Sequence, residues 1–227
     1  MTTWRVARLV AAKDLRIEAR SRVVVNQVLP FSLLVMVLFA FALDNDTVLT
    51  RVAPGLVWLA TLFSMLVLVQ RAFAVETADG ALDALTVAGV RPSGLFLGKA
   101  MAMAVQLVVL EVVLLFAAIV LYKVDVGGAG IVLLVTTFVA ATTGLAFVGT
   151  LYGGLASGAK GRETLLPLLM LPVVAPVLIG ATRATEAALG TNGASPSEGW
   201  PWIGLLVLFA ALFGAGGTLA FGTLIDA

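Results

Sequence analysis

The chain has 227 residues, of which 61% are hydrophobic and 12% are charged, and its formal net charge is +1. Soluble domains carry about 25% charged residues, so this composition and the mean hydropathy of +1.10 indicate a protein that crosses a membrane several times. Because the sequence contains no Cys and no His, it lacks the commonest metal ligands, general base and nucleophile pairs, and we expect neither a metal site nor a catalytic site in it.

A charged segment precedes the first apolar stretch. Residues 4–22 favour a helix and contain no Pro or Gly. At 100° per residue, an arc of roughly 140° holds the basic residues Arg5, Arg8, Lys13, Arg16 and Arg20. We expect residues 1–22 to form an amphipathic interfacial helix on the cytoplasmic leaflet, with basic side chains near anionic lipid headgroups.

Two acids in this segment do not suit a lipid surface. Asp14 and Glu18 lie one helical turn apart. Solvation or local pairing is the favoured explanation, and the nearby basic residues are Arg16, Arg20 and Arg22. Contact with a basic partner is the alternative.

Six stretches are long enough, or nearly so, for the roughly 20 apolar residues that a membrane-spanning helix needs. They are residues 23–43, 52–69, 100–122, 131–151, 165–182 and 202–224. We expect the first to remain uncleaved, because its apolar run is about twice that of a signal peptide. The fifth contains Pro167, Pro172 and Pro176, which predict a kinked or broken helix held by its neighbours. The fold class is therefore all-α integral membrane, with one permease domain over residues 1–227.

The basic residues in the loops predict the orientation, because cytoplasmic loops are enriched in Lys and Arg. One side holds eleven of them: Arg5, Arg8, Lys13, Arg16, Arg20, Arg22, Arg71, Arg91, Lys99, Lys160 and Arg162. The other side holds three: Arg51, Lys123 and Arg183. Both termini are therefore expected in the cytoplasm.

The loop between the second and third spans carries a patterned polar segment. Three acids occur in it, Glu76, Asp79 and Asp83, and Leu82 and Leu85 are spaced for one side of a helix. Gly80 interrupts the run, so a short helix is predicted to begin near Ala81. An amphipathic helix of this kind suits docking into a groove on another protein.

The end of this loop has a misleading motif. Residues 93–100 (SGLFLGKA) resemble the end of a phosphate-binding loop, which requires G-x-x-x-x-G-K-[ST]. Ser93 replaces the first Gly, and Ala100 replaces the hydroxyl residue that would contact Mg²⁺. We therefore expect no ATP site here, and interpret Lys99 as a positive anchor where the third span begins.

Two polar residues fall inside the third span, Gln106 and Glu111. A charged side chain near the middle of the bilayer costs about 2.5–3.5 kcal/mol on insertion scales, so Glu111 should face protein or water, or be protonated. Its role is either transport or gating, or a hydrogen bond between helices. The second interpretation is favoured, with Thr61, Ser64 or a hydroxyl residue of the fourth span as the partner.

The pattern E-x-x-x-G-[AST]-L-[DE]-x-L, followed by a Pro and then by G-K at the head of a span, resembles the type-2 family of ABC transporter permeases. Its positions here are Glu76, Gly80, Ala81, Leu82, Asp83, Leu85, Pro92, Gly98 and Lys99. Within that family, the chain is similar to the CcmB permeases of the cytochrome c maturation system. That similarity includes residues 13–20 (KDLRIEAR), 53–64 (APGLVWLATLFS) and 165–181 (LLPLLMLPVVAPVLIGA).

The resemblance implies a function for the loop. It is similar to a coupling helix that seats in a cleft of a cytoplasmic ATPase subunit, through residues Glu76, Gly80, Ala81, Leu82, Asp83 and Leu85. The implied partners are a CcmA-like ATPase, a CcmC-like haem-handling protein, a CcmD-like single-span subunit, a second copy of this chain and membrane lipid, but no nucleic acid. ATP and Mg²⁺ would be bound by the ATPase, haem would be handled by the complex, and this chain would bind no cofactor. The expected location is the bacterial cytoplasmic (inner) membrane.

Two alternatives remain open from the sequence. The first is a type-2 exporter permease for another cargo, such as a lipid, drug or polysaccharide. The second is a proton-coupled secondary carrier that uses Glu111, which predicts paired broken helices.

Overall fold

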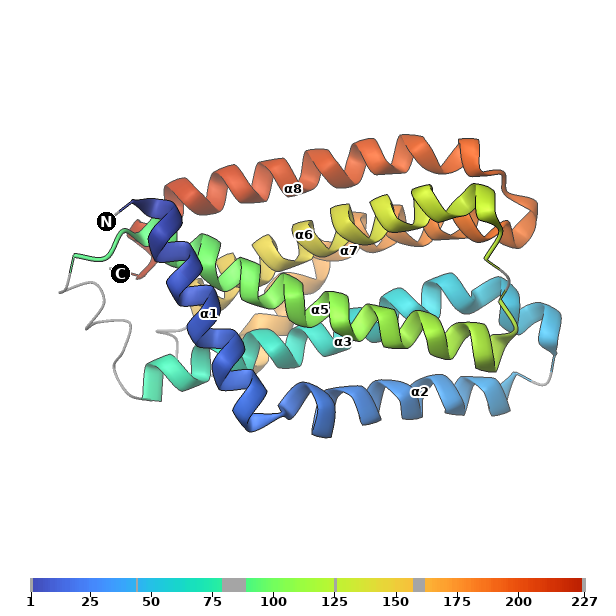
Figure 1. The fold of residues 1–227 in the computed structure, drawn as a ribbon, viewed down its shortest axis with the longest axis horizontal. Helices are drawn as coiled ribbons and strands as arrows, with labels where there is room; N and C mark the ends of the chain where they lie inside the picture. The colour runs from blue at the N-terminus through green and yellow to red at the C-terminus, as the bar shows by residue number, and fades with distance from the viewer. Residues whose placement is uncertain (1, 44, 79–88, 125, 157–161, 226–227) are drawn as a thin grey trace.

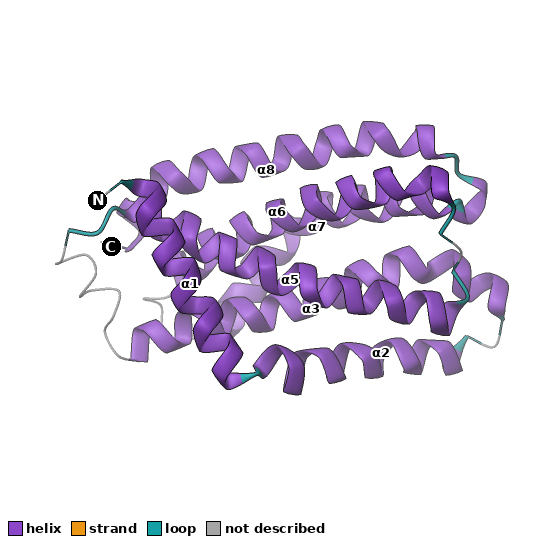
Figure 2. Ribbon diagram, viewed as in Figure 1, coloured by secondary structure: helices purple, strands orange, loops and turns teal. Residues whose placement is uncertain are grey.

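The computed structural model describes residues 2–43, 45–78, 89–124, 126–156 and 162–225, with side chains omitted at 75–78, 162–165, 224 and 225. In chain order, the elements are α1 (Thr3–Ser21), η1 (Val24–Val28), α2 (Leu29–Ala42), α3 (Asp46–Ala78), α5 (Pro92–Tyr122), η2 (Gly128–Gly130), α6 (Ile131–Ala156), α7 (Arg162–Leu189), η3 (Thr191–Gly193) and α8 (Pro196–Ile225). The η1 segment is a π-helical turn, and η2 and η3 are 3₁₀ turns. Across the described ranges the chain is helix and loop, without strands (Figure 2).

Six helical segments are long and apolar enough to cross a membrane, which confirms the predicted all-α architecture. They are Val24–Ala42, Asp46–Ala74, Pro92–Tyr122, Gly128–Ala156, Leu166–Leu189 and Pro196–Thr223. Figure 1 shows them side by side in one bundle, with the start of α1 and the end of α8 at the same end. The protein is therefore a multi-pass membrane protein.

The helices extend further than the apolar stretches of the sequence. α3 continues to Ala78 and α5 begins at Pro92, whereas the predicted spans end at residue 69 and begin at residue 100. Pro92 is the first residue of α5, a position where its missing N–H would have no helical partner in any case. Hydropathy marks only the part of a helix inside the hydrocarbon, whereas these helices continue into polar sequence.

The proline-rich helix α7 is not broken. It runs from Arg162 to Leu189 as one helix, with all three prolines inside it. Each proline removes one backbone donor, but α7 packs against α3, α6 and α8. The expected support by neighbouring helices is therefore present, and it lets the helix tolerate the lost hydrogen bonds without the break that was the stronger form of the prediction.

The core lies where α3, α5 and α6 meet, and the outer faces are apolar. Trp58, Phe73 and Phe96 are fully buried, whereas Phe41 and Leu219 are each 84% exposed on the outside of the bundle. Because lipid tails are as apolar as these side chains, such an outer surface suits a membrane-spanning bundle. Polar side chains in the interior therefore mark the positions where specific contacts are made.

Candidate functional site

Helix α1 packs closely against the beginning of α5. Its buried residues are Val6, Ala7, Val10 and Ala11. A Cβ atom added at Gly98 would lie 2.6 Å from the carbonyl oxygen of Ala7, and one added at Gly94 would lie 2.8 Å from Cβ of Val6. Two glycines one turn apart therefore allow the two backbones to approach. The apolar side of α1 is covered by α5, which leaves its basic side as the surface away from the protein.

Lys99 is buried beneath α1, with 2% of its surface exposed. Its Nζ lies 3.4 Å from Oδ2 of Asp14, donates a 3.2 Å hydrogen bond to the carbonyl oxygen of Ala72, and lies 4.7 Å from the centre of the Phe73 ring. Lys99 was interpreted as a positive anchor where the third span begins, but it is buried inside the protein seven residues after α5 starts at Pro92. The reason is tertiary: α1 covers this turn of α5, and a buried cation requires partners of this kind.

The acids of α1 have partners inside the chain. Asp14 lies between Lys13, whose Nζ is 3.2 Å from Oδ1, and Lys99. The backbone N–H of Val24 donates a 2.6 Å hydrogen bond to Oε1 of Glu18. Glu18 therefore fixes the turn between α1 and the first span, where Arg22 has a left-handed conformation with φ of 52°.

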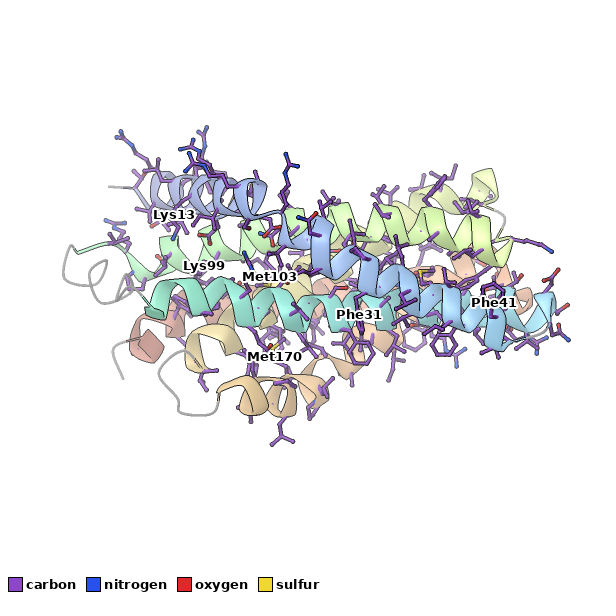
Figure 3. All side chains as sticks on the ribbon, turned by 90° about the horizontal axis from the view of Figure 1, so that it is seen from below. Lys13, Phe31, Phe41, Lys99, Met103 and Met170 are labelled. Atoms are coloured by element: carbon purple, nitrogen blue, oxygen red, sulfur yellow. The ribbon has the colours of Figure 1, made fainter. Side chains whose placement is uncertain are left out.

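The expected local pairing occurs for Asp14, but its local partner is Lys13 and not one of the predicted arginines. In the described part of the chain, Asp14 and Glu18 form no ion pair with Arg16, Arg20 or Arg22. Arg16 and Arg20 are exposed, on the side of α1 away from the bundle. Figure 3 shows nitrogen-tipped side chains extending outward from α1, with the labelled Lys99 on its inner side.

A cavity of about 50 Å³ lies between α1, α3 and α5. Its polar lining includes Lys13 and Asp14 from α1, Arg71 from α3, and Lys99 and Gln106 from α5. This volume holds at most a few water molecules. We refer to Lys99 and its contacts Asp14, Ala72 and Phe73 as the Lys99 cluster. Gln106 is half-buried at this cavity, so the structure brings it near the Lys99 cluster rather than near Glu111.

The predicted ATPase-coupling residues are mostly outside the described residues. Gly80, Ala81, Leu82, Asp83 and Leu85 fall there, and Glu76 is in α3 but its side chain is not described. The residues on both sides of this segment, in contrast, are described by the structure. Ala72 and Phe73 of α3 precede it, Lys99 of α5 follows it, and these residues contact one another. The Lys99 cluster therefore joins both flanks of the predicted coupling segment to α1.

Glu111 is the second buried ionisable group of α5. It is 0% exposed, and the hydroxyl of Thr142 in α6 donates a 2.6 Å hydrogen bond to its Oε2. Its Oε1 has no hydrogen-bond partner among the described residues. Thr142 belongs to the fourth span, one of the expected sources of a partner, whereas Ser64 and Thr61 bond elsewhere.

Other polar contacts between spans were not predicted, and three of those that the structure describes are buried. The hydroxyls of Ser32 and Ser64 lie 2.8 Å apart, and Nε1 of Trp58 donates a 2.9 Å hydrogen bond to Oγ1 of Thr185. The hydroxyl of Tyr122 donates a 2.8 Å hydrogen bond to a backbone carbonyl of α2. A polar residue in an apolar span is a usable signal for such contacts, but it does not identify the partner.

Metal binding has no support in the described part of the chain, where no three His, Cys, Asp or Glu side chains are grouped closely enough to hold an ion. The chemistry available at the Lys99 cluster is electrostatic: a buried cation, a carboxylate, a carbonyl oxygen and an aromatic ring from three helices. These contacts link the three helices at one point.

Comparisons with known proteins identify relatives of this chain. The family model described as CcmB protein matches residues 5–221. Heme exporter protein B of Escherichia coli (strain K12) is 31% identical over 221 residues, which covers 97% of this chain and 94% of the relative. The Haemophilus influenzae protein of the same name is 33% identical over 180 residues (78% and 79%), and that of Paracoccus denitrificans is 29% identical over 197 residues (86% and 88%).

Proposed function

This chain belongs to the CcmB family, and we propose that it is the membrane permease subunit of an ABC transporter complex that serves cytochrome c maturation. Its relatives carry the name Heme exporter protein B, which supports haem as the cargo of the complex. The chain contains no His or Cys to ligate haem iron, so we assign haem handling to a CcmC-like partner. A CcmD-like subunit and a second copy of this chain complete the proposed complex.

The energy for this function comes from a separate ATPase. A CcmA-like subunit binds ATP and Mg²⁺ in the cytoplasm and contacts Glu76 and the segment from Gly80 to Leu85. The distribution of basic residues supports this side as cytoplasmic, in the inner membrane of a bacterium. The structure supports the same topology, because both chain ends and both flanks of this segment lie at one end of the bundle (Figure 1).

The Lys99 cluster is the observation that carries the coupling proposal. Lys99 contacts Asp14 of α1 and Ala72 of α3, and it is itself part of α5. Movement of the coupling segment relative to the membrane would displace α3 and α5, and the buried contacts make α1 follow. The three helices then respond as one unit to ATP-driven closure of the ATPase.

A single substitution in the coupling segment tests the proposal. We expect Leu82→Glu to abolish association with the ATPase, because a charge replaces an apolar anchor, while the protein still inserts into the membrane. The measurement is a pull-down of the tagged chain from membranes that contain the co-expressed ATPase and haem-handling subunits, with ATPase activity and haem absorbance read on the eluate. The control is Arg91→Glu, which introduces the same acid at an exposed residue at the same end of the bundle.

Each outcome distinguishes between hypotheses. Normal ATPase association of the Leu82→Glu protein contradicts the coupling assignment. If the wild-type chain retains an ATPase but no haem-loaded partner, the complex is a type-2 exporter with another cargo.

A proton-coupled carrier is the second candidate function. The observation in its favour is Glu111, which is fully buried and has one oxygen without a partner among the described residues. The continuous α7 argues against it, because this function predicts paired broken helices. Transport that follows a proton gradient without ATP, and that Glu111→Gln abolishes, would identify a carrier.

A further inference from the structure

The side of α1 that faces away from α5 carries only positive charge. Its charged residues are the exposed Arg5, Arg8, Arg16 and Arg20, which lie within about 120° of one another at 100° per residue. None of these four arginines forms an ion pair within the described ranges of the chain. The acids of the helix, Asp14 and Glu18, lie on the opposite side and bind Lys99 and a backbone N–H. We define this set of four arginines as the basic face.

The position of α1 places the basic face at the membrane surface. The helix packs on Gly94 and Gly98, in the first turns of the span Pro92–Tyr122, and it leads directly into the span Val24–Ala42. It therefore lies where two spans leave the hydrocarbon. Trp4 and Leu9 are 59% and 55% exposed on the same helix, and exposed Trp is typical of the headgroup level.

We propose that the basic face of α1 binds the anionic headgroups of phospholipids in the leaflet that surrounds this end of the bundle. Arginine suits this ligand, because its planar guanidinium donates paired hydrogen bonds to phosphate oxygens. Clusters of four or more Lys and Arg on an interfacial helix attract anionic lipid. This inference is independent of the proposed transport function.

The packing of α1 predicts how the lipid is bound. A free amphipathic helix inserts its apolar side among acyl chains, but here Val6, Ala7, Val10 and Ala11 are buried within the protein. The basic face is thus held in place by protein contacts whether or not lipid is bound. Binding should accordingly depend on headgroup charge and weaken in salt, because exposed charges are screened.

Native mass spectrometry of the full chain tests this inference with two probes, phosphatidylglycerol and phosphatidylcholine of equal acyl length. We expect the wild-type chain to retain phosphatidylglycerol about tenfold better, and Arg5→Gln/Arg8→Gln/Arg16→Gln to reduce that preference to about twofold or less. The matched control removes three exposed positive charges at the other end of the bundle, in Arg51→Gln/Lys123→Gln/Arg183→Gln, and should keep the preference.

Other results would overturn the inference. Equal retention of the two lipids by the wild-type chain excludes a specific role of the basic face. The same conclusion follows if the control variant loses the preference for phosphatidylglycerol as much as the α1 variant does. At 0.5 M salt the screening length is less than about half of its value of roughly 10 Å at 0.1 M. A lipid preference that persists at 0.5 M salt therefore excludes an electrostatic contact. If the α1 variant keeps its lipid preference and loses an acidic protein partner, the face binds protein instead. Unchanged elution volume and thermal transition show that each variant is folded.

Discussion

The two buried ionisable groups of α5, Lys99 and Glu111, differ in the number and kind of their contacts. Lys99 lies near the beginning of the helix and has a carboxylate, a carbonyl oxygen and an aromatic ring around it. Glu111 lies about 18 Å further along and receives one hydrogen bond, from Thr142. The first group joins three helices through charge, whereas the second joins two helices through a hydroxyl. This difference is the basis for our proposal that the first group couples helices and that the second serves in packing.

The largest expected effect is at the Lys99 cluster. Asp14→Asn removes a carboxylate from a cation whose side chain is 1% exposed, so we expect the free energy of unfolding to fall by about 3 kcal/mol. Lys13→Met is the matched control, since it removes the more exposed partner of the same carboxylate and should cost less than about 1 kcal/mol. Unfolding by SDS titration in mixed micelles measures both values. Equal effects of the two substitutions would mean that the buried pair has no special weight.

A second prediction concerns the packing that buries Lys99. Gly98→Ala places a methyl group 2.6 Å from the Ala7 carbonyl oxygen, so α1 must shift, and we expect a loss of about 1–3 kcal/mol. Gly204→Ala in α8 is the control, because a Cβ there has open space, and it should be neutral or stabilising by up to about 1 kcal/mol. A displaced α1 is more accessible, so cleavage of α1 by added protease should increase in the Gly98 variant and not in the Gly204 variant. Resistance equal to that of wild type would show that α1 does not depend on this glycine.

The smallest expected effect is at Glu111. Thr142→Val removes the described hydrogen bond from Thr142 to Glu111, and such bonds between helices contribute about 0.6 kcal/mol on average in membrane proteins. Glu111→Gln keeps the side-chain shape and an acceptor oxygen, so it should cost no more and should leave ATPase-driven activity unchanged. Activity assays of the complex and SDS unfolding check these expectations. Loss of activity without loss of stability in Glu111→Gln would reverse the comparison and give Glu111 the functional role.

Several features of the fold could be predicted because membranes constrain sequences strongly. The six predicted apolar stretches correspond to six helices. Each span needs about 20 apolar residues, and its backbone N–H and C=O groups must form hydrogen bonds within the span because lipid offers none. The ends of α3 and α5 could not be predicted, because helices continue past the hydrocarbon without a hydropathy signal. The three prolines of α7 predicted a kinked or broken helix, and the break is absent because α7 runs as one helix.

The candidate site divides in a similar manner. The sequence by itself determined the membrane class, the spans, the basic character of α1 and the presence of a carboxyl group in the third span. Only the tertiary structure decided that Lys99 is buried, that Asp14 is its partner 85 residues away, and that Gly94 and Gly98 seat α1. The physical reason is that hydropathy and helical periodicity are properties of neighbouring residues. A counter-ion or a close backbone approach instead depends on how distant helices pack, and no local pattern records it.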